Sequence, residues 1–247
     1  MTGRSRLDVL LVQRGLAESC EKARAIIMAG SVVVGERPAL KPGTLVATDA
    51  DIRVLAGPQY VSRGGDKLAH ALDTFALDVR SLTVVDARAS TGGFTDCLLQ
   101  RGAARVYAID VGRGLLDWRL RQDPRVVVME GVNVRYLKSL PEKGDLATID
   151  VSFISLEKVI LPLMGLLRGD ARIVALVKPQ FQARREEVRK GGVVRDPQVH
   201  AAVLGRFIAW CVGRRLRLLG LTTSPLLGPA GNKEFFLLLG VPSEALS

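Results

Sequence analysis

One segment constrains the fold of this chain more than any other: an apolar run over residues 82–85 that leads into the glycine pair Gly92-Gly93. A short run rich in β-branched residues is typical of a buried parallel strand, and paired glycines are typical of a turn that needs unusual φ values. Residues 95–100 then have the pattern of a helix, which Arg101-Gly102 ends, and a second apolar run follows over residues 106–109. The order strand, turn, helix, strand predicts a βαβ unit in a parallel sheet.

Each strand of this unit ends in a carboxylate, Asp86 after the first and Asp110 after the second. Their spacing is close to that at which a βαβ unit presents an acid to the ribose hydroxyls of a nucleotide-like ligand. The dinucleotide fingerprint requires glycine at the positions of Arg88, Ser90 and Gly93, and one glycine in three argues against NAD. The arrangement instead resembles the S-adenosylmethionine site of Rossmann-like methyltransferases. A tight turn that binds nothing is the alternative for this segment by itself.

The length and composition predict an α/β fold with two domains. The 247 residues suffice for one large α/β domain of about 180 residues and a small module. Hydrophobic residues make up 48% of the chain and aromatic residues only 5%, which suits a parallel sheet with helices on both faces. We place the boundary near Gly57-Pro58, which gives domains at residues 1–58 and 59–247.

The charge predicts a polyanionic partner. The chain contains 35 Lys and Arg against 25 Asp and Glu, a net charge of +10, and both nucleic acid and an anionic membrane would satisfy it. The longest apolar stretch, residues 159–167, contains Pro162 and is far shorter than the roughly 20 residues that span a bilayer. No secretory signal is evident. We therefore expect no membrane span and a cytoplasmic protein.

The cysteines and histidines argue against a metal site. Cys20, Cys97 and Cys211 are widely separated in sequence and form no Cys-x-x-Cys pair. His70 and His200 stand beside no second metal ligand or nucleophile in the sequence. We expect all five residues to be structural and no metal to be bound.

The N-terminal part of the chain predicts a small α+β module. Residues 7–14 and 20–29 have helical spacing, and each segment ends at a glycine. Residues 32–34 and 51–55 predict short strands. With Arg6-Leu-Asp8, Ser19-x-x-Lys22-Ala, Ile27-Met-Ala-Gly30 and Val32-x-Val34-Gly35, this pattern resembles the S4 RNA-binding domain over residues 5 to about 56.

The S4 resemblance implies that the two helices lay basic side chains along structured RNA. Cys20 stands where family members usually carry Arg, so we expect one phosphate contact fewer and a lower salt dependence. Residues 1–64 contain nine Lys and Arg against six Asp and Glu, so we expect the RNA footprint to extend onto the large domain. A solvated basic helix face without a ligand is the alternative. The predicted RNA contacts are Arg6, Lys22, Arg24 and Arg63.

Four charged residues stand near the ends of apolar strands, where α/β proteins usually have their active sites. Asp150 and Lys178 each follow an apolar run, Glu234 precedes one, and Lys67 follows a polar loop that opens a helix. Burying an unpaired charge is costly, so the presence of charged residues at these positions requires an explanation. A structural ion-pair network would explain any one of them. Their joint occurrence beside a cofactor-type turn favours catalysis.

The motifs around these four residues resemble one known family nearly end to end. They are Tyr60-Val-Ser-Arg-Gly-Gly-x-Lys67, Asp150-Val-Ser-Phe-Ile-Ser155, Val177-Lys178-Pro-Gln-Phe181 and Gly231-Asn-x-Glu234-Phe235. Together they resemble the TlyA (hemolysin A) family of ribosomal RNA 2′-O-methyltransferases, whose catalytic domain is of the FtsJ type. The resemblance implies a Rossmann-like methyltransferase domain with a mostly parallel seven-stranded sheet. It also implies S-adenosylmethionine as cofactor, ribosomal RNA or ribosomal subunits as partner, and a cytidine ribose in 23S and, in some members, 16S rRNA as substrate.

The resemblance also implies roles for individual residues. Lys178 would act on the ribose 2′-hydroxyl and Asp150 would hold it in place. Lys67 and Glu234 would position the ribose. Asp110 would bind the cofactor ribose and Asn133 or its neighbours the adenine, while Asp86 and the Gly-Gly turn would shape the methionine end. The residues expected to bind the cofactor are Asp86, Ser90, Gly92, Gly93, Phe94, Asp110 and Asn133.

Arg88 departs from the family pattern Asp-x-Gly-x-Ser-Thr-Gly-Gly, which has Gly at this position. If the position requires φ > 0, a residue other than Gly costs on the order of 1–2 kcal/mol. We therefore predict weakened cofactor binding. Two alternatives to an active methyltransferase follow: a ribosome-binding protein with an impaired cofactor site and, less favoured, a hemolysin that acts on membranes. The complete set of four charged residues favours the enzyme.

Overall fold

The computed structural model describes residues 3–28, 30–39, 41–55, 59–184, 187–188 and 191–243. The chain divides into two compact units, Met1–Gln59 and Tyr60–Ser247. The predicted domain boundary at Gly57-Pro58 lies outside the described residues. No helix of the described segments is long and apolar enough to cross a membrane.

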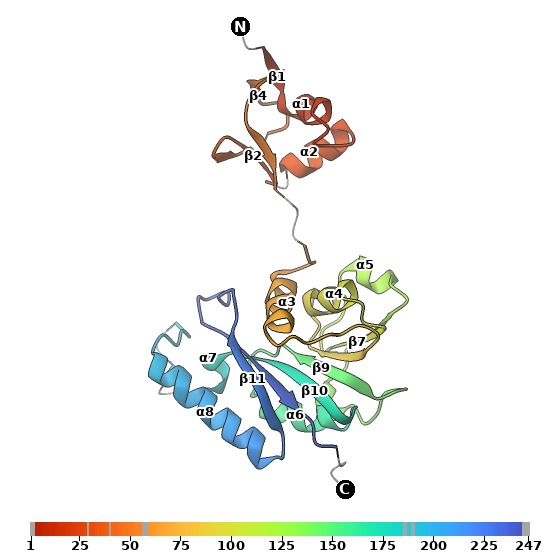
Figure 1. The fold of residues 1–247 in the computed structure, drawn as a ribbon, viewed down its shortest axis with the longest axis vertical. Helices are drawn as coiled ribbons and strands as arrows, with labels where there is room; N and C mark the ends of the chain where they lie inside the picture. Colours follow the sequence, from red (N-terminus) through yellow and green to blue (C-terminus); the bar gives the residue numbers. More distant parts are fainter. Residues whose placement is uncertain are drawn as a thin grey trace. The chain divides into compact units, whose positions relative to one another are not determined.

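The first unit is built on two short helices that pack against each other (Figure 1). The helices are α1 (Leu7–Gln13) and α2 (Cys20–Met28), close to the predicted segments; Ala29 is outside the described residues. Their apolar faces bury side chains such as Leu7, Leu11 and Ile27. Strands β2 (Val32–Val34), β3 (Arg37–Pro38) and β5 (Ile52–Val54) form an antiparallel sheet, and β1 (Arg4–Arg6) pairs with β4 (Leu45–Ala47).

The second unit contains a seven-stranded sheet in the order β11-β12-β10-β9-β6-β7-β8. Its strands are β6 (Thr83–Ala87), β7 (Arg105–Asp110), β8 (Val126–Glu130), β9 (Gly144–Ile149), β10 (Leu167–Val177), β11 (Arg217–Thr223) and β12 (Phe235–Gly240). The neighbours from β10 to β8 pair parallel, while β12 runs antiparallel between β10 and β11. The predicted βαβ unit and the mostly parallel seven-stranded sheet are confirmed.

Helices cover both faces of this sheet (Figure 1). One layer contains α3 (Arg63–Thr74), α4 (Gly93–Gln100) and α5 (Trp118–Gln122); the other contains α6 (Glu157–Met164) and α8 (Pro197–Gly213). Alternate residues of one strand point to opposite faces, so Val84 packs in the first layer and Val85 in the second. This two-sided burial explains the continuous apolar runs of the sequence and leaves polar residues at the strand ends. The described part of the unit also contains two short helices, η1 (Val134–Tyr136) and α7 (Pro179–Gln182).

Candidate active site

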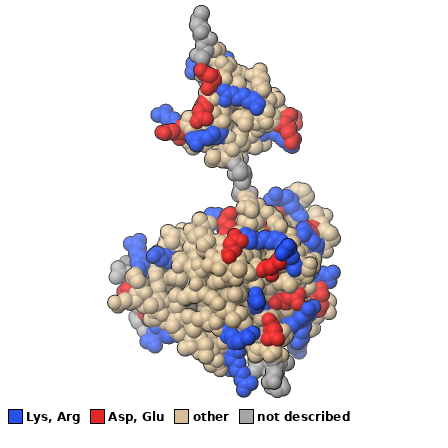
Figure 2. All heavy atoms as spheres, viewed as in Figure 1, with Lys and Arg blue, Asp and Glu red and all other residues tan. Residues whose placement is uncertain are grey.

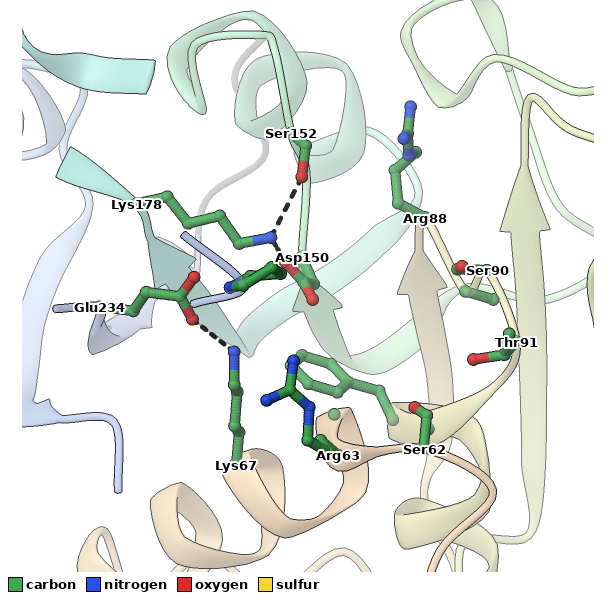
Figure 3. Close-up of a pocket in the computed structure, with 15 residues that line it drawn as sticks. Ser62, Arg63, Lys67, Arg88, Ser90, Thr91, Asp150, Ser152, Lys178 and Glu234 are labelled. Carbon is green, nitrogen blue, oxygen red and sulfur yellow. Dashed lines mark hydrogen bonds and ion pairs between the residues drawn. The ribbon is translucent and has the colours of Figure 1, made fainter. Parts of the chain in front are cut away.

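A cavity of about 280 Å³ lies at the carboxyl ends of β6, β9 and β10. Lys67, Asp150, Lys178 and Glu234 all line it, although the sequence separates Lys67 from Glu234 by most of the unit (Figure 3). The parallel topology explains their meeting, because the carboxyl ends of neighbouring parallel strands share one edge of the sheet. Among the described residues, no cluster of three or more His, Cys, Asp and Glu could hold a metal ion.

Lys67 and Glu234 form a buried ion pair in this cavity. The Lys67 ammonium donates to Glu234 Oε2 at 2.6 Å, and the two side chains are 9% and 0% exposed. The other carboxylate oxygen of Glu234, Oε1, is buried and accepts no hydrogen bond from the described residues. Gly228 provides the space for it, since a Cβ there would lie 2.6 Å from Oε1. A buried acceptor without a donor is costly, so Glu234 is suited to receive a hydroxyl from a ligand.

Lys178 and Asp150 form a second ion pair across the ends of β9 and β10. The Lys178 ammonium also donates to Ser152 Oγ at 3.1 Å (Figure 3). The Lys178 side chain is 12% exposed and that of Asp150 is 28% exposed, so this pair is more open to the cavity than Lys67–Glu234. A partly open ammonium fixed by two oxygen acceptors can approach a polar substrate group without losing its counter-charge.

The turn after β6 holds an unusual backbone. Arg88 has φ 72°, Ser90 has φ 52° and Gly92 has φ 96°. A Cβ on Gly92 would lie 2.2 Å from Leu120 Cδ1, and one on Gly93 would lie 2.2 Å from Ser62 Oγ. Both glycines are therefore required for close packing, and Gly92 also for its left-handed conformation. The turn brings Ser90, Gly93 and the Phe94 ring to the wall of the first cavity.

A second cavity of about 320 Å³ lies beside the first and contains Asp110 and Asn133. Asp110 is the last residue of β7. Its Oδ2 accepts the backbone N–H of Ser90 and its Oδ1 that of Gly112, and the residue is 5% exposed. Asn133 Oδ1 accepts the backbone N–H of Arg135. Arg88 lines both cavities. The two cavities and the Gly-Gly turn thus fit an elongated nucleoside ligand with a polar and an apolar end.

Asp86 lies beneath the turn and lines neither of these cavities. It is 1% exposed and accepts hydrogen bonds from the hydroxyls of Thr95 and Thr148. Burial raises the pKa of this carboxyl to about 6, against the two hydroxyl hydrogen bonds, which lower it. Gly92 is likewise absent from both cavity walls. Asp86 therefore supports the turn from the strand, and Gly92 shapes the turn itself.

The predicted RNA contacts fall in both units. Arg63 lines the first cavity, at the start of α3. Arg6 and Arg24 of the first unit both donate to Asp8, a carboxylate that is 1% exposed, while their own side chains are 50% and 56% exposed. The hydrogen bond from Arg6 is the main reason that the pKa of Asp8 is lowered strongly. Lys22 pairs with the exposed Glu18.

Two serines of the site were missed by the sequence analysis. Ser152 accepts from Lys178, and Ser62 lies against the Gly93 turn. Both stand inside the quoted motifs, one after Asp150 and the other before Lys67. Their positions were visible, but a serine next to a charged residue has no spacing that indicates a hydrogen bond.

Comparison with known proteins agrees with this geometry. The model of the FtsJ-like methyltransferase family matches residues 60–241, and that of the S4 domain matches residues 5–52. The chain belongs to the FtsJ-like methyltransferase family. The family resemblance predicted from the motifs is therefore confirmed, and an S4 domain precedes the methyltransferase domain.

Relatives match over nearly the whole chain. The 16S/23S rRNA (cytidine-2′-O)-methyltransferase TlyA of Mycobacterium tuberculosis is 47% identical, with 99% of this chain and 92% of TlyA covered. Hemolysin A of Brachyspira hyodysenteriae is 38% identical, with 93% of this chain and 97% of the relative covered. A solved structure of a hemolysin candidate from Streptococcus thermophilus is 41% identical, with a TM-score of 0.75, and covers 99% of this chain and 90% of its own.

Proposed function

We propose that this protein transfers a methyl group from S-adenosylmethionine to the 2′-hydroxyl of a cytidine in 23S, and also 16S, ribosomal RNA. One observation carries the proposal: the paired Lys178 and Asp150 meet Lys67 and Glu234 in one cavity beside the Gly-Gly turn. The name of the M. tuberculosis relative supplies the nucleotide and the two RNAs. The S4 domain supports an RNA substrate.

The cofactor brings an activated methyl group, so the remaining task of the protein is to aim the ribose hydroxyl and lower its barrier to attack. Lys178 is the residue suited to this step. Its ammonium stabilises the negative charge that develops on the attacking oxygen, and its unprotonated form can take the hydroxyl proton at Nζ. Asp150 and Ser152 fix the position of Nζ.

Lys67 and Glu234 would hold the ribose. Glu234 Oε1 is a buried acceptor with no donor in the described chain, and a ribose hydroxyl would satisfy it. Lys67 donates to the second oxygen of Glu234 and so fixes its orientation. Both therefore act through the placement of the substrate, which sets the in-line geometry of methyl transfer.

Different residues of the two cavities would contact the methionine, ribose and adenine parts of the cofactor. Ser90, Gly93 and Phe94 would contact the methionine part, with the N-terminus of α4 favouring its carboxylate. Asp110 retains lone pairs for the ribose hydroxyls beyond the two that accept backbone N–H groups. Asn133 and the apolar wall of the second cavity would take the adenine. Asp86 and Gly92 would support the turn.

Basic residues of both units would bind the RNA backbone. Arg63 stands at the mouth of the catalytic cavity, and Arg6, Lys22 and Arg24 stand on the first unit. On the face shown in Figure 2, Lys and Arg of the first unit are interspersed with acids, and the second unit shows an uncharged area over β11. Phosphate contacts from separate small clusters give affinity through their sum.

Transfer of labelled methyl from S-adenosylmethionine to purified, unmodified large and small ribosomal subunits tests the proposal. Label is expected in the RNA of both subunits, at a cytidine 2′-oxygen. Lys178→Ala should abolish it, whereas Lys158→Ala, a lysine of α6 away from the cavity, should not. Label at a base atom, or equal label with Lys178→Ala, would refute the proposal.

One observation favours a second candidate function, a ribosome-binding protein with an impaired cofactor site. Arg88 adopts φ 72° in the turn and its side chain lines both cavities. Subunit binding without methyl transfer, at any cofactor concentration, would support this candidate. Leakage from anionic lipid vesicles tests the hemolysin alternative.

A further inference from the structure

Arg88 occupies a place in the cofactor turn that its own backbone disfavours. It follows β6 directly, and its φ of 72° lies in the left-handed region, which side chains with a Cβ adopt at a cost. Its backbone N–H donates to Ile109 O at 2.8 Å, so the strained conformation is fixed by the neighbouring strand β7. A strained residue held in a ligand-binding turn points to a function for its side chain.

The side chain of Arg88 faces the carboxylate that would bind the cofactor ribose. Its Nε lies 4.0 Å from Asp110 Oδ2, and the two side chains are 36% and 5% exposed. In Figure 3 the Arg88 side chain extends away from Lys178 and Asp150. Arg88 lines the first cavity as well, but its guanidinium pairs with Asp110, which lines the second cavity.

We propose that Arg88 sets the cofactor affinity of this protein by competing with the cofactor ribose for Asp110. The inference rests on the proposed function, since it takes the second cavity as the site of the nucleoside. Both oxygens of Asp110 already accept a backbone N–H, so the lone pairs that remain are those a ribose would use. The guanidinium faces this same carboxylate. A ribose bound at Asp110 would compete with the guanidinium for these lone pairs.

The opposite role, in which the guanidinium binds the methionine carboxylate, fits the geometry less well. The turn and the N-terminus of α4, which suit that carboxylate, line the first cavity. The ion pair of Arg88 with Asp110 instead lies at the second cavity, where the nucleoside would bind. Arg88 also adds positive charge to a site that must accept a sulfonium.

Calorimetric titration of the full-length chain with S-adenosylmethionine and with adenosine tests the inference. Adenosine carries the ribose and base but neither sulfonium nor carboxylate. Arg88→Gly should bind both ligands about fivefold more tightly, the range expected when one partly exposed ion pair no longer competes. Arg88→Gln, which keeps a polar side chain but loses the charge, should recover most of this gain. Arg88→Gly should also fold, because Gly adopts the observed φ readily.

Arg119→Gln is the matched control: it makes the same change of charge at an arginine of the same unit that pairs with a carboxylate, Asp117, and lines neither cavity. It should leave the affinity for adenosine within twofold. Unchanged or weaker binding of adenosine by Arg88→Gly would overturn the inference, and so would weaker binding of S-adenosylmethionine alone, which would assign the guanidinium to the carboxylate. These readouts need no methyl transfer. Tighter binding without transfer by any variant would therefore contradict the proposed function and leave the inference standing.

Discussion

The two units of this protein place cations beside acids in opposite ways. In the S4 unit the acid is buried and the cations are open: Asp8 is 1% exposed, whereas Arg6 and Arg24 are at least half exposed. In the catalytic cavity of the methyltransferase unit the cations are largely shielded from solvent as well, with Lys67 9% and Lys178 12% exposed. Open guanidinium groups can reach phosphates at little desolvation cost, while buried ammonium groups act in a low dielectric.

This difference in the exposure of the cations suits the S4 unit to binding RNA and the methyltransferase unit to catalysis. A charge in water is screened and loses little when a single partner is removed. A buried charge interacts strongly with a developing charge nearby, and it destabilises the protein when its partner is removed. We therefore expect substitutions in the methyltransferase unit to affect the rate of transfer and the stability, and those in the S4 unit to affect RNA affinity.

The largest effect is expected from Lys178→Ala. Loss of a positioned proton acceptor and charge stabiliser typically costs about 10²- to 10⁴-fold in rate. Subunit affinity should change little, because Lys178 is mostly buried. Single-turnover methyl transfer measures this, with Lys158→Ala as the matched control. A loss below about fivefold would remove Lys178 from the chemical step.

Glu234→Gln should have the next largest effect, on stability. The substitution leaves the buried Lys67 ammonium without its counter-charge, which costs about 3–5 kcal/mol in comparable sites. Urea unfolding monitored by circular dichroism measures this free energy. The double variant Lys67→Met, Glu234→Gln should recover much of the loss. If both variants unfold alike, the ion pair is not the cause.

Asp86→Asn should change how stability depends on pH. The pKa of Asp86 is about 6 in the folded chain and near 4 when unfolded. Between these values the folded state keeps a proton that the unfolded chain has released, so stability falls as pH rises from about 4 to about 6. Relative to the parent, Asp86→Asn should therefore gain up to about 3 kcal/mol between pH 4 and pH 7. Parallel unfolding curves across this range would contradict the raised pKa.

Asp8→Asn should have the smallest effect, which is on RNA affinity. Whether the affinity rises or falls is informative. The change raises the net charge by one, which by itself would strengthen RNA binding. If Asp8 instead positions Arg6 and Arg24, affinity for the large subunit should fall a few-fold at fixed salt. Asp49→Asn, the same change at a position that pairs with neither arginine in the described structure, is the control. A thermal melt shows whether the S4 unit remains folded.

Much of the site could be predicted because the sequence contains local signals for it. Lys178 and Asp150 follow apolar strands, and parallel strands bring such ends together. The pairing of Lys67 was not predictable: nothing in the sequence links Lys67 to Glu234 rather than to Asp150, because that depends on side-chain directions. The placement of Asp86 beneath the turn also required the hydroxyls of Thr95 and Thr148 from two other elements.

The fold was predicted best where the signal was a buried parallel strand. The start of β10 at Leu167 was missed because Arg168, Gly169 and Asp170 interrupt the apolar pattern, and the register shifts there. The edge strand β11 was missed because Gly220 interrupts its apolar run, where the register also shifts. The three-residue strands β1 and β4 are too short for a periodic pattern.

One measurement tests the division of labour between the two units most directly: single-turnover methyl transfer as a function of subunit concentration, for Lys178→Ala and Asp8→Asn in parallel. The account predicts that Lys178→Ala loses the maximal rate and keeps the half-saturating concentration, whereas Asp8→Asn keeps the maximal rate and needs more subunit to reach it. The reverse assignment, or a loss of maximal rate in both variants, would contradict it.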